Sequence, residues 1–358
     1  MKILFLIQKP QARGAEIFAS RLGNELIKKG HEVKVISIFE GNYELPFSGR
    51  LIRLNRKPTA RFSDLKGWKE LNKIILDFQP DLVQAMGADT LKFMVFSKLL
   101  FRWKAKTVFY NGSMISSYIR SGLVKLFNQW LYNQVDAVVA VSQASRKDFE
   151  EIFRFKKPHK VIPVGIVKES DERILEPVEN PTLIHIGGFT FEKNHAGLLR
   201  IFSKVLEKQS KAKLILIGDG PLRPEIENLA EKMNLNPSII WKGSLRNPFS
   251  TIPPNAFLLL PSIIEGSPAV ISEAFFNRIP VVAYATGGIS ELIQNGQTGW
   301  LIQKNKEEEF AELVLQLIDK GQKEIELVLD QALDFSRENF LIDKVGEKYE
   351  EFYRKILN

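Results

Sequence analysis

The sequence predicts an α/β fold of two doubly wound, parallel-sheet domains. Short apolar segments alternate with helix-length stretches throughout the chain, and this alternation starts afresh near residue 180. The length of 358 residues suits about two domains. Apolar residues make up 44% of the chain and charged residues 26%, which is ordinary for a protein that buries a core. We therefore expect helices on both faces of two parallel sheets.

The first half opens with an apolar strand at residues 2–7, a loop that ends in Gly14 and a helix over residues 15–29. Gly30 ends that helix, because glycine readily adopts the left-handed conformation common at helix C-termini. The remaining strands of this half are expected at residues 31–38, 81–86, 107–110, 136–141 and 161–163. Residues 168–181 are acidic, contain two prolines and show no periodicity, so they are the predicted linker.

The second half repeats this order, with a strand at residues 182–187 and a helix from about His195. Its further strands are expected at residues 213–217, 239–241, 256–260, 280–284 and 299–302. Residues 336–357 have the pattern of a charged amphipathic helix. The predicted domains are 1–168, 169–335 and a terminal segment, 336–358, that packs towards the first domain. Because ligands bind at the carboxyl ends of parallel strands, the cleft between the domains is the expected site.

Charge is distributed unevenly between the halves. Residues 1–168 carry 29 Lys and Arg against 14 Asp and Glu, a formal charge of +15, whereas the remainder carries −7. A half this basic is expected to meet phosphate, on a substrate, a lipid surface or a nucleic acid. Residues 50–73 hold eight Lys and Arg, and residues 91–106 mix five of them with Phe and Trp. We expect both segments to face an anionic membrane, unless their aromatic side chains belong to the core.

The composition excludes several classes of protein. With no Cys, the chain has no disulfide scaffold, no Cys-ligated metal site and no Cys nucleophile. Only five consecutive apolar residues precede Gln8, too few for a signal peptide, and no uncharged apolar run approaches the roughly 20 residues that span a bilayer. We therefore expect a cytoplasmic protein that is neither secreted nor membrane-spanning.

Residues 262–273, which follow an apolar strand, hold the densest group of candidate site residues. Pro268 suits the first position of a helix, whose unpaired N–H groups would form an anion site. Glu265 precedes this helix and Glu273 lies about a turn and a half inside it. One carboxylate can therefore face the cleft while the other reaches a ligand hydroxyl. The alternative is that the two glutamates serve only in helix capping and on a solvated helix face.

This stretch resembles the retaining, nucleotide-sugar-dependent glycosyltransferases of group 1, whose mark is a pair of glutamates eight positions apart, here Glu265 and Glu273. The resemblance extends over most of the chain, in order and in spacing. It includes residues 29–33, 79–83, 136–142, 192–194, 216–221, 280–283, 287–293 and 296–299. It implies the GT-B fold, in which two Rossmann-like domains face each other across a cleft, and the activity of a hexosyltransferase.

The resemblance also implies roles for individual residues. Glu273 would bind the donor ribose hydroxyls, Lys193 would contact the donor diphosphate and Glu265 would lie beside the transferred sugar, so that Lys193 and Glu265 are the candidate catalytic residues. The other implied donor-binding residues are Gly14, Gly187, Gly188, Ser267, Ala269 and Val270. A Lys ammonium and helix N-terminal amides can stabilise a leaving diphosphate without a metal. Because the chain has no Asp-x-Asp sequence, we expect no required metal and no cofactor.

The chain departs from the family pattern at several places, and two of them concern the charge around the diphosphate. Gly188 stands where the family usually has an arginine, so one of two cations for the diphosphate is missing. The first loop has Arg13-Gly14 in place of the usual Gly-Gly. Arg13 is therefore a candidate to restore the missing charge from across the cleft.

We interpret the chain as a retaining glycosyltransferase, peripheral on the inner face of the membrane, that moves a sugar from a nucleotide sugar to a lipid-linked, lipopolysaccharide or polysaccharide acceptor. Two other classes stay open. One is a non-catalytic GT-B subunit that binds a partner, which Gly188 favours and the group of Lys193, Glu265 and Glu273 opposes. The other is a nucleic-acid-binding protein, but the chain has no motif of that class, so no nucleic-acid partner is expected.

Overall fold

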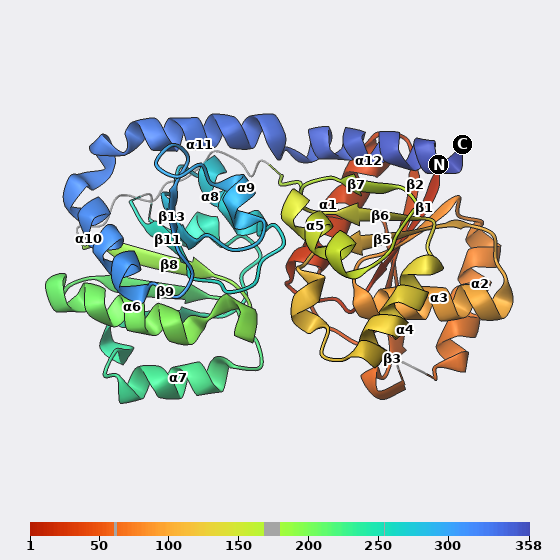
Figure 1. Ribbon diagram of the computed structural model, residues 1–358, viewed down its shortest axis with the longest axis horizontal. Helices are drawn as coiled ribbons and strands as arrows, with labels where there is room; N and C mark the ends of the chain where they lie inside the picture. The colour runs from red at the N-terminus through yellow and green to blue at the C-terminus, as the bar shows by residue number, and fades with distance from the viewer. Residues whose placement is uncertain (61–62, 168–179, 254) are drawn as a thin grey trace. The chain divides into compact units, whose positions relative to one another are not determined.

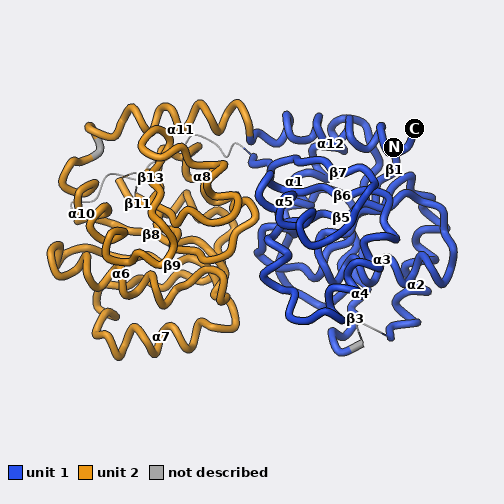
Figure 2. Tube along the Cα trace, viewed as in Figure 1, with its two compact units in different colours: residues 1–167, 340–358 blue, residues 168–339 orange. Residues whose placement is uncertain are grey.

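Two compact units make up the computed structural model, which describes residues 1–60, 63–167, 180–253 and 255–358 (Figure 1). Unit 1 comprises Met1–Val167 and Phe340–Asn358, and unit 2 comprises Lys168–Asn339 (Figure 2). The chain therefore leaves unit 1, builds unit 2 and returns to unit 1. The predicted linker, residues 168–181, lies outside the described residues except at its last two positions.

Unit 1 is built on a parallel sheet with seven strands in its described residues, in the order β3-β2-β1-β4-β5-β6-β7. The strands are β1 (Lys2–Ile7), β2 (Glu32–Phe39), β3 (Arg50–Arg56), β4 (Leu82–Ala85), β5 (Lys106–Asn111), β6 (Ala137–Ala140) and β7 (His159–Val161). Ile3 to Ile7 are fully buried, as expected of a strand covered on both faces. The edge strand β3 is absent from the predicted strands, because three arginines, typical of a protected edge, obscure its apolar residues.

Six helices accompany this sheet. They are α1 (Gly14–Lys28), α2 (Leu65–Phe78), α3 (Ala88–Phe101), α4 (Gly122–Asn133), α5 (Gln143–Ile152) and α12 (Ile342–Leu357), within the described residues of unit 1. α12 packs on α1, with the ring centroids of Phe18 and Tyr349 5.8 Å apart. The buried hydroxyl of Tyr353 donates to Oε1 of Gln84 on β4 over 2.7 Å. These contacts make α12 part of the core of unit 1.

The helix predicted over residues 336–357 is wrong at its start. Ser336 lies in α11 (Glu326–Asn339), and a new helix begins at Ile342 after an extended Leu341 with φ −60° and ψ 137°. Ile166 N donates to Phe340 O over 2.7 Å, and Ile342 N donates to Ile166 O over 2.9 Å. A continuous helix would use these backbone groups internally, so the bridge to Ile166 takes the place of helical bonds here.

Unit 2 repeats the plan of unit 1, with six parallel strands among its described residues in the order β10-β9-β8-β11-β12-β13. The strands are β8 (Thr182–Ile186), β9 (Lys213–Ile217), β10 (Ile239–Lys242), β11 (Phe257–Leu260), β12 (Val281–Tyr284) and β13 (Trp300–Ile302). The helices are α6 (His195–Lys208), α7 (Arg223–Lys232), α8 (Ala269–Phe276), α9 (Ile289–Leu292), α10 (Glu307–Glu324) and α11. Each strand falls on a predicted segment, because buried parallel strands are short apolar runs.

Each unit has a core of its own. In unit 1 the core includes side chains of α2, α3 and α5, and in unit 2 it includes side chains of α6, α10 and α11. Phe93 and Trp103, from the predicted membrane segment 91–106, are 2% and 6% exposed and belong to the core of unit 1. The alternative interpretation of these two aromatic side chains, as core residues, is therefore confirmed.

Both sheets reverse their strand order at one point. In unit 1 the chain moves from β1 outward to β3 and then from β4 to β7 on the other side. In unit 2 it moves from β8 to β10 and then from β11 to β13. In such sheets the loops after the two central strands diverge, and the crevice between them at the carboxyl ends is where ligands bind. We refer to these two places as the switch points of unit 1 and unit 2.

Candidate active site

The switch point of unit 2 brings the two candidate catalytic side chains into contact. Lys193 follows β8 and Glu265 follows β11, and Nζ of Lys193 lies 2.5 Å from Oε1 of Glu265. Only 23% of the Lys193 side chain and 9% of the Glu265 side chain are exposed. An ion pair is screened less in such a place than on the open surface, so the two charges interact strongly.

Asn194 fixes the end of the loop that carries Lys193. Its backbone is left-handed (φ 53°), a conformation that asparagine tolerates better than most residues. Its Oδ1 caps α6 by accepting from Gly197 N at 3.2 Å, and its Nδ2 donates to Pro261 O at 3.0 Å. One side chain thus joins the start of α6 to the end of β11, which holds the loops of Lys193 and Glu265 beside each other.

Hydrogen bonds support the loop of Glu265 on both sides. Towards β8, Ile263 N donates to Glu192 O over 2.8 Å. Towards β12, Gly288 N donates to Glu265 O over 3.2 Å. Thr286 Oγ1 also donates to Ile263 O over 3.2 Å. The Glu265 carboxylate is therefore presented by a fixed backbone, as a preorganised site requires.

α8 begins directly after this loop, at Ala269. Pro268 is its N-cap residue and not its first helical residue as predicted, because ψ of 112° keeps Pro268 extended. No side chain caps this helix. Its first N–H groups, which form the positive end of the helix dipole, therefore lack a side-chain acceptor. Ser267 and Val270 lie at the same terminus, and Glu273 lies about one turn further along α8, partly exposed. Such a terminus suits a phosphate or another oxyanion.

Glycines allow the loops after β8 and β9 to approach closely. Gly218 has φ 139°, and a Cβ there would lie 2.0 Å from Gly187 O, so a side chain cannot be accommodated. A Cβ on Gly187 would lie 3.0 Å from Nε2 of His185 and 3.5 Å from the Lys193 side chain. Gly187 therefore packs directly beside Lys193.

Gly188, which stands where the family usually has an arginine, has room for a side chain. A Cβ at this position would lie 3.5 Å from Asp219 O and 4.0 Å from the methyl group of Thr190, both ordinary van der Waals distances. The loop therefore does not require glycine here for steric reasons at Cβ.

Two histidines beside Lys193 are missing from the predicted site. His185 on β8 is fully buried, and its Nδ1 donates to Leu259 O over 2.8 Å. His195, the first residue of α6, stacks on Phe189 with ring centroids 4.0 Å apart. Burial lowers the pKa of His185 to about 4 and the pKa of His195 to about 2, and the charge of Lys193 contributes to both shifts. Both rings are neutral at pH 7, so neither adds positive charge beside Lys193.

The switch point of unit 1 carries carboxyl and amide groups, which the sequence did not predict. Glu16, in the first turn of α1, is 4% exposed, and Gln11 Nε2 donates to its Oε1 over 3.0 Å. Gln8 follows β1 and donates to Asp89, at the start of α3, over 2.9 Å. Burial raises the pKa of Glu16 to about 7, although the hydrogen bond from Gln11 and the charge of Arg13 lower it.

Two predicted site residues, Arg13 and Gly14, lie in this part of unit 1 and are exposed. Arg13 is the N-cap residue of α1, and its charge acts on the nearby Glu16. A Cβ on Gly14 would meet no atom within 4 Å, so packing does not require glycine there. The compensation of Gly188 by Arg13 stays a prediction.

Two parallel-sheet, Rossmann-like units, each with one reversal of strand order, are the architecture of the GT-B class of glycosyltransferases. Comparison with known families supports this class. The family described as Glycosyl transferases group 1 matches residues 167–328, and Glycosyltransferase Family 4 matches residues 12–169. The two matches together span residues 12–328, and the chain is a glycosyltransferase with the GT-B fold.

Known relatives cover nearly the whole chain. The alpha-monoglucosyldiacylglycerol synthase of Streptococcus pneumoniae is 24% identical over 96% of this chain and 83% of its own. The N-acetyl-alpha-D-glucosaminyl L-malate synthase of Bacillus anthracis is 23% identical over 97% of this chain and 95% of its own. The crystal structure of Anabaena HepE in complex with UDP and glucose has the same fold, with a TM-score of 0.84, 18% identity and coverage of 99% of this chain and 100% of that one.

Within the ranges that the structure describes, no helix is long and apolar enough to cross a bilayer. Within the same ranges, no three side chains of His, Cys, Asp or Glu are grouped so that they could hold a metal ion. The expectation that no metal is required stays a prediction.

Proposed function

We propose that this protein is a retaining glycosyltransferase that transfers a hexosyl group from a nucleotide sugar to a lipid-linked or cell-surface polysaccharide acceptor at the inner face of the membrane. The observation that carries the proposal is the contact of Lys193 with Glu265 at the switch point of unit 2, directly before the N-terminus of α8. Two comparisons support it: HepE holds UDP and glucose on the same fold, and the streptococcal relative is named for a glucosyl lipid.

The donor diphosphate fits the positive groups of this switch point. A nucleoside diphosphate gains negative charge as it leaves the anomeric carbon, and fixed positive charge stabilises that change. Lys193 and the N–H groups at the start of α8 supply such charge. We expect the Lys193 ammonium to pair with the diphosphate in place of Glu265, so that the Glu265 carboxylate can contact the sugar.

Retention requires the acceptor to attack from the face on which the diphosphate leaves. The acceptor oxygen forms its bond to the anomeric carbon as the bond from that carbon to the diphosphate oxygen breaks. The same diphosphate oxygen accepts the proton of the acceptor hydroxyl. Glu265 would stabilise the positive charge that develops on the sugar ring, and Glu273 would bind the ribose hydroxyls.

The membrane location rests on the charge of unit 1. Several cations of segment 50–73 are exposed, although Arg56 is tied to Asp64 by two hydrogen bonds of 2.7 and 2.6 Å. Each Lys or Arg close to an anionic leaflet contributes roughly 1 kcal/mol, so a few free cations suffice for reversible docking. A lipid-linked acceptor would be presented at such a surface.

UDP-glucose is the first donor to test. The purified protein should bind UDP-glucose in titration calorimetry and release UDP slowly by hydrolysis. Glu265→Gln removes the charge and keeps the shape of the side chain. This variant should still bind UDP but should hydrolyse UDP-glucose at least about tenfold more slowly. The matched variant Glu231→Gln, on the exposed side of α7, should behave as the wild type. The proposal fails if a panel of nucleotide sugars gives neither binding nor turnover.

Gly188 favours a second candidate, a GT-B subunit that binds a nucleotide sugar without transferring the sugar. Such a subunit would lack the second cation for the diphosphate, and Gly188 provides none. It would bind UDP-glucose with no measurable UDP release, and Glu265→Gln would change nothing in that assay. A rate that depends on Glu265 would rule this candidate out.

A further inference from the structure

Apolar side chains are exposed along α4 and the segment before it. Leu123 is 80% exposed, Leu126 68%, Tyr118 46% and Trp130 40%. Leu123, Leu126 and Trp130 are spaced by three and four positions, so they lie on one face of α4. Every residue of the first turn and a half of this helix is exposed, and only Leu131 and Tyr132, near its end, are buried. An apolar helix face that the protein itself does not cover marks a site of interaction.

α3 packs against α4 (Figure 1), and exposed apolar side chains are found on α3 as well. The ring of Trp130 lies 6.0 Å from that of Phe127 and 6.1 Å from that of Phe96 on α3, measured between centroids. Leu99 and Leu100 lie one turn after Phe96 and are 45% and 51% exposed. We name this face the α4 surface. It consists of Leu99, Leu100, Tyr118, Leu123, Leu126 and Trp130.

The α4 surface lies in a part of the chain that is free of acidic residues. Between Asp89 and Asp136 there are seven Lys and Arg and not one Asp or Glu. Two of these cations are used internally. Lys92 pairs with Asp89 at 3.1 Å, and Lys98 pairs with Asp136 at 3.2 Å.

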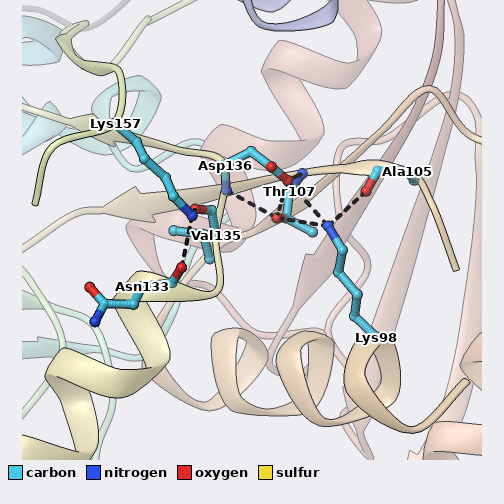
Figure 3. Close-up of polar contacts among 7 residues, drawn as sticks. All are labelled: Lys98, Ala105, Thr107, Asn133, Val135, Asp136 and Lys157. Carbon is cyan, nitrogen blue, oxygen red and sulfur yellow. Dashed lines mark hydrogen bonds and ion pairs between the residues drawn. The ribbon is translucent and has the colours of Figure 1, made fainter. Parts of the chain in front are cut away.

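Figure 3 shows how two lysines fix the ends of α3 and α4 to the sheet. Lys98 also donates to Ala105 O over 3.1 Å, next to its pair with Asp136. Lys157 donates to Asn133 O and Val135 O over 2.7 and 2.6 Å, at the end of α4. The buried end of α4 is therefore anchored, whereas the residues at its start are exposed.

Five cations of this acid-free segment remain for a partner. They are exposed and form no ion pair with any residue that the structure describes: Arg102, Lys104, Lys106, Arg120 and Lys125. In the sequence, Arg120 precedes the apolar side chains of α4 and Lys125 lies among them. The partner of this surface should therefore carry negative charge at its surface and have an apolar interior beneath it.

We propose that the α4 surface inserts into the headgroup region of an anionic lipid bilayer. The proposal rests on the proposed function, for which it identifies the docking face. Exposed leucines, a Trp and a Tyr among unpaired cations form the composition of an interfacial helix. A second copy of this chain or another protein is the weaker occupant, because a stable interface buries about 800 Å² on each partner and six partly exposed side chains do not supply that area.

Topology connects this surface to the crevice of unit 1. Residues 112–121 lead from the carboxyl end of β5 to the start of α4, so the exposed start of α4 lies at the carboxyl edge of the sheet. The switch point between β1 and β4 opens at the same edge. An acceptor could thus keep its lipid tail in the bilayer while its polar head reaches that crevice.

A matched pair of single labels tests the insertion directly. The chain has no cysteine, so Leu126→Cys and Leu327→Cys each introduce one labelling site. Leu126 on α4 and Leu327 on α11 are each 68% exposed. With an environment-sensitive fluorophore, vesicles of phosphatidylcholine and phosphatidylglycerol should shift the emission at position 126 to the blue and leave position 327 unchanged. No shift at position 126, or an equal shift at both positions, would overturn the proposal.

Vesicle sedimentation of the full-length protein separates the apolar and ionic contributions. Leu123→Ser combined with Leu126→Ser should weaken binding to the anionic vesicles at least about tenfold. Arg120→Gln combined with Lys125→Gln should weaken it about fivefold per cation at low salt, and much less at high salt. Leu327→Ser should bind as the wild type. Equal binding of all variants would refute the α4 surface, and a wild-type dimer that only the α4 variants dissociate would assign it to a second copy.

Donor binding distinguishes this proposal from the proposed function. The α4 variants should bind UDP-glucose like the wild type when no lipid is present, because no residue of the α4 surface is among the candidate donor-binding residues. Vesicle binding without binding of any nucleotide sugar would refute the proposed function but would still support the α4 surface as the docking face. Nucleotide-sugar binding and turnover without vesicle binding would remove the docking face alone.

Discussion

The switch points of the two units differ in the polar groups that they carry, and the net charge of each chain half does not predict these groups. Unit 1 derives mostly from the half with a formal charge of +15, yet its switch point holds the carboxyls of Glu16 and Asp89 beside Gln11. Unit 2 derives from the half with −7, yet its switch point holds Lys193 and the positive end of α8. The charged groups at both switch points are largely paired, Lys193 with Glu265 and Asp89 with Lys92.

This difference limits what net charge can predict. The charge of the first half predicts a phosphate partner for that half. The groups found in its crevice, carboxyls and carboxamides, are instead suited to hydrogen bonds with the hydroxyls of a sugar-like acceptor. A lysine and a helix N-terminus suit a diphosphate. Net charge thus indicates what a surface attracts, whereas the side chains at the strand ends indicate what the crevice binds.

Removing the charge of Lys193, the cation at the switch point of unit 2, should have the largest effect on turnover. Lys193→Met should lower turnover about 10²- to 10³-fold, the usual consequence of losing one donor to a developing negative charge, and should weaken UDP binding much less. Lys232→Met, an exposed change on α7, serves as control and should alter neither quantity. Initial rates and titration calorimetry measure the two. Equal losses in binding and turnover would show that Lys193 acts in binding only.

Glu16→Gln tests the carboxyl of unit 1. Its folded-state pKa of about 7 lies above the usual 4.5, so the folded protein keeps a proton that the unfolded chain releases between these values. The wild type therefore loses stability as the pH rises through this window, by on the order of 3 kcal/mol. The variant should be more stable than the wild type at about pH 8 and nearly equal at about pH 4 in urea unfolding. A difference that does not change with pH would contradict a buried, ionisable Glu16.

Glu273→Ala addresses the ribose end of the unit 2 site. The loss of a charged acceptor should weaken nucleotide binding by roughly 1.5 to 3 kcal/mol, because a ribose hydroxyl would be left without its partner. Calorimetry with UDP measures this change. Glu338→Ala on α11 offers a glutamate outside the crevice loops as control. Unchanged affinity in Glu273→Ala would remove Glu273 from the donor site.

His195→Phe sharpens the contrast between the two units, since its pH response runs opposite to that of Glu16. The folded-state pKa of about 2 lies below the usual 6.5, so the unfolded chain gains a proton that the folded protein does not. The wild type loses stability from this group as the pH falls below 6.5. The variant keeps a ring on Phe189 and should gain roughly 1 kcal/mol relative to the wild type between about pH 6.5 and 5.5. A constant difference across this range would count against a buried neutral His195.

Gly188→Arg should have the smallest effect and tests whether Arg13 compensates for the missing cation. If Arg13 supplies the charge, a second guanidinium should crowd the diphosphate and slow transfer by a few-fold. Arg13→Ala should then slow transfer as well. A faster Gly188→Arg enzyme, together with a harmless Arg13→Ala, would show that nothing compensates for Gly188. Steady-state rates of both variants decide between these outcomes.

The strands of unit 2 and the contact between Lys193 and Glu265 were predictable from the sequence. Its strands are short apolar runs, which local pattern identifies, and the spacing of Glu265 and Glu273 points to the loop before α8. Lys193 and Glu265 are 72 positions apart, and their contact follows from the family resemblance and the strand order. Asn194 was not identified, because its two hydrogen bonds join segments that are remote in the sequence.

Features that depend on burial were not predictable in the same way. Glu16 lies within the apolar pattern of α1, and His185 interrupts an apolar strand. Their apolar neighbours in the sequence are the only local sign that either side chain is buried. The edge strand β3 carries charges that conceal its pattern. The break at Phe340 and Leu341 requires a backbone partner, Ile166, from the far end of unit 1. Each of these outcomes is decided by tertiary contacts, which override local preference.

The place of α12 in unit 1 has a consequence for the order in which the protein is made. Unit 2 ends at Asn339, whereas the core of unit 1 takes Tyr349 and Tyr353 from the later α12. A ribosome adds about 5–20 residues per second, so all of unit 2 leaves the ribosome before the helix that completes unit 1. During that interval the Phe18 side of α1 is uncovered and the Gln84 side chain lacks its tyrosine partner. The first unit to be translated is the last to be finished, and its open apolar face is available to chaperones until translation passes residue 357.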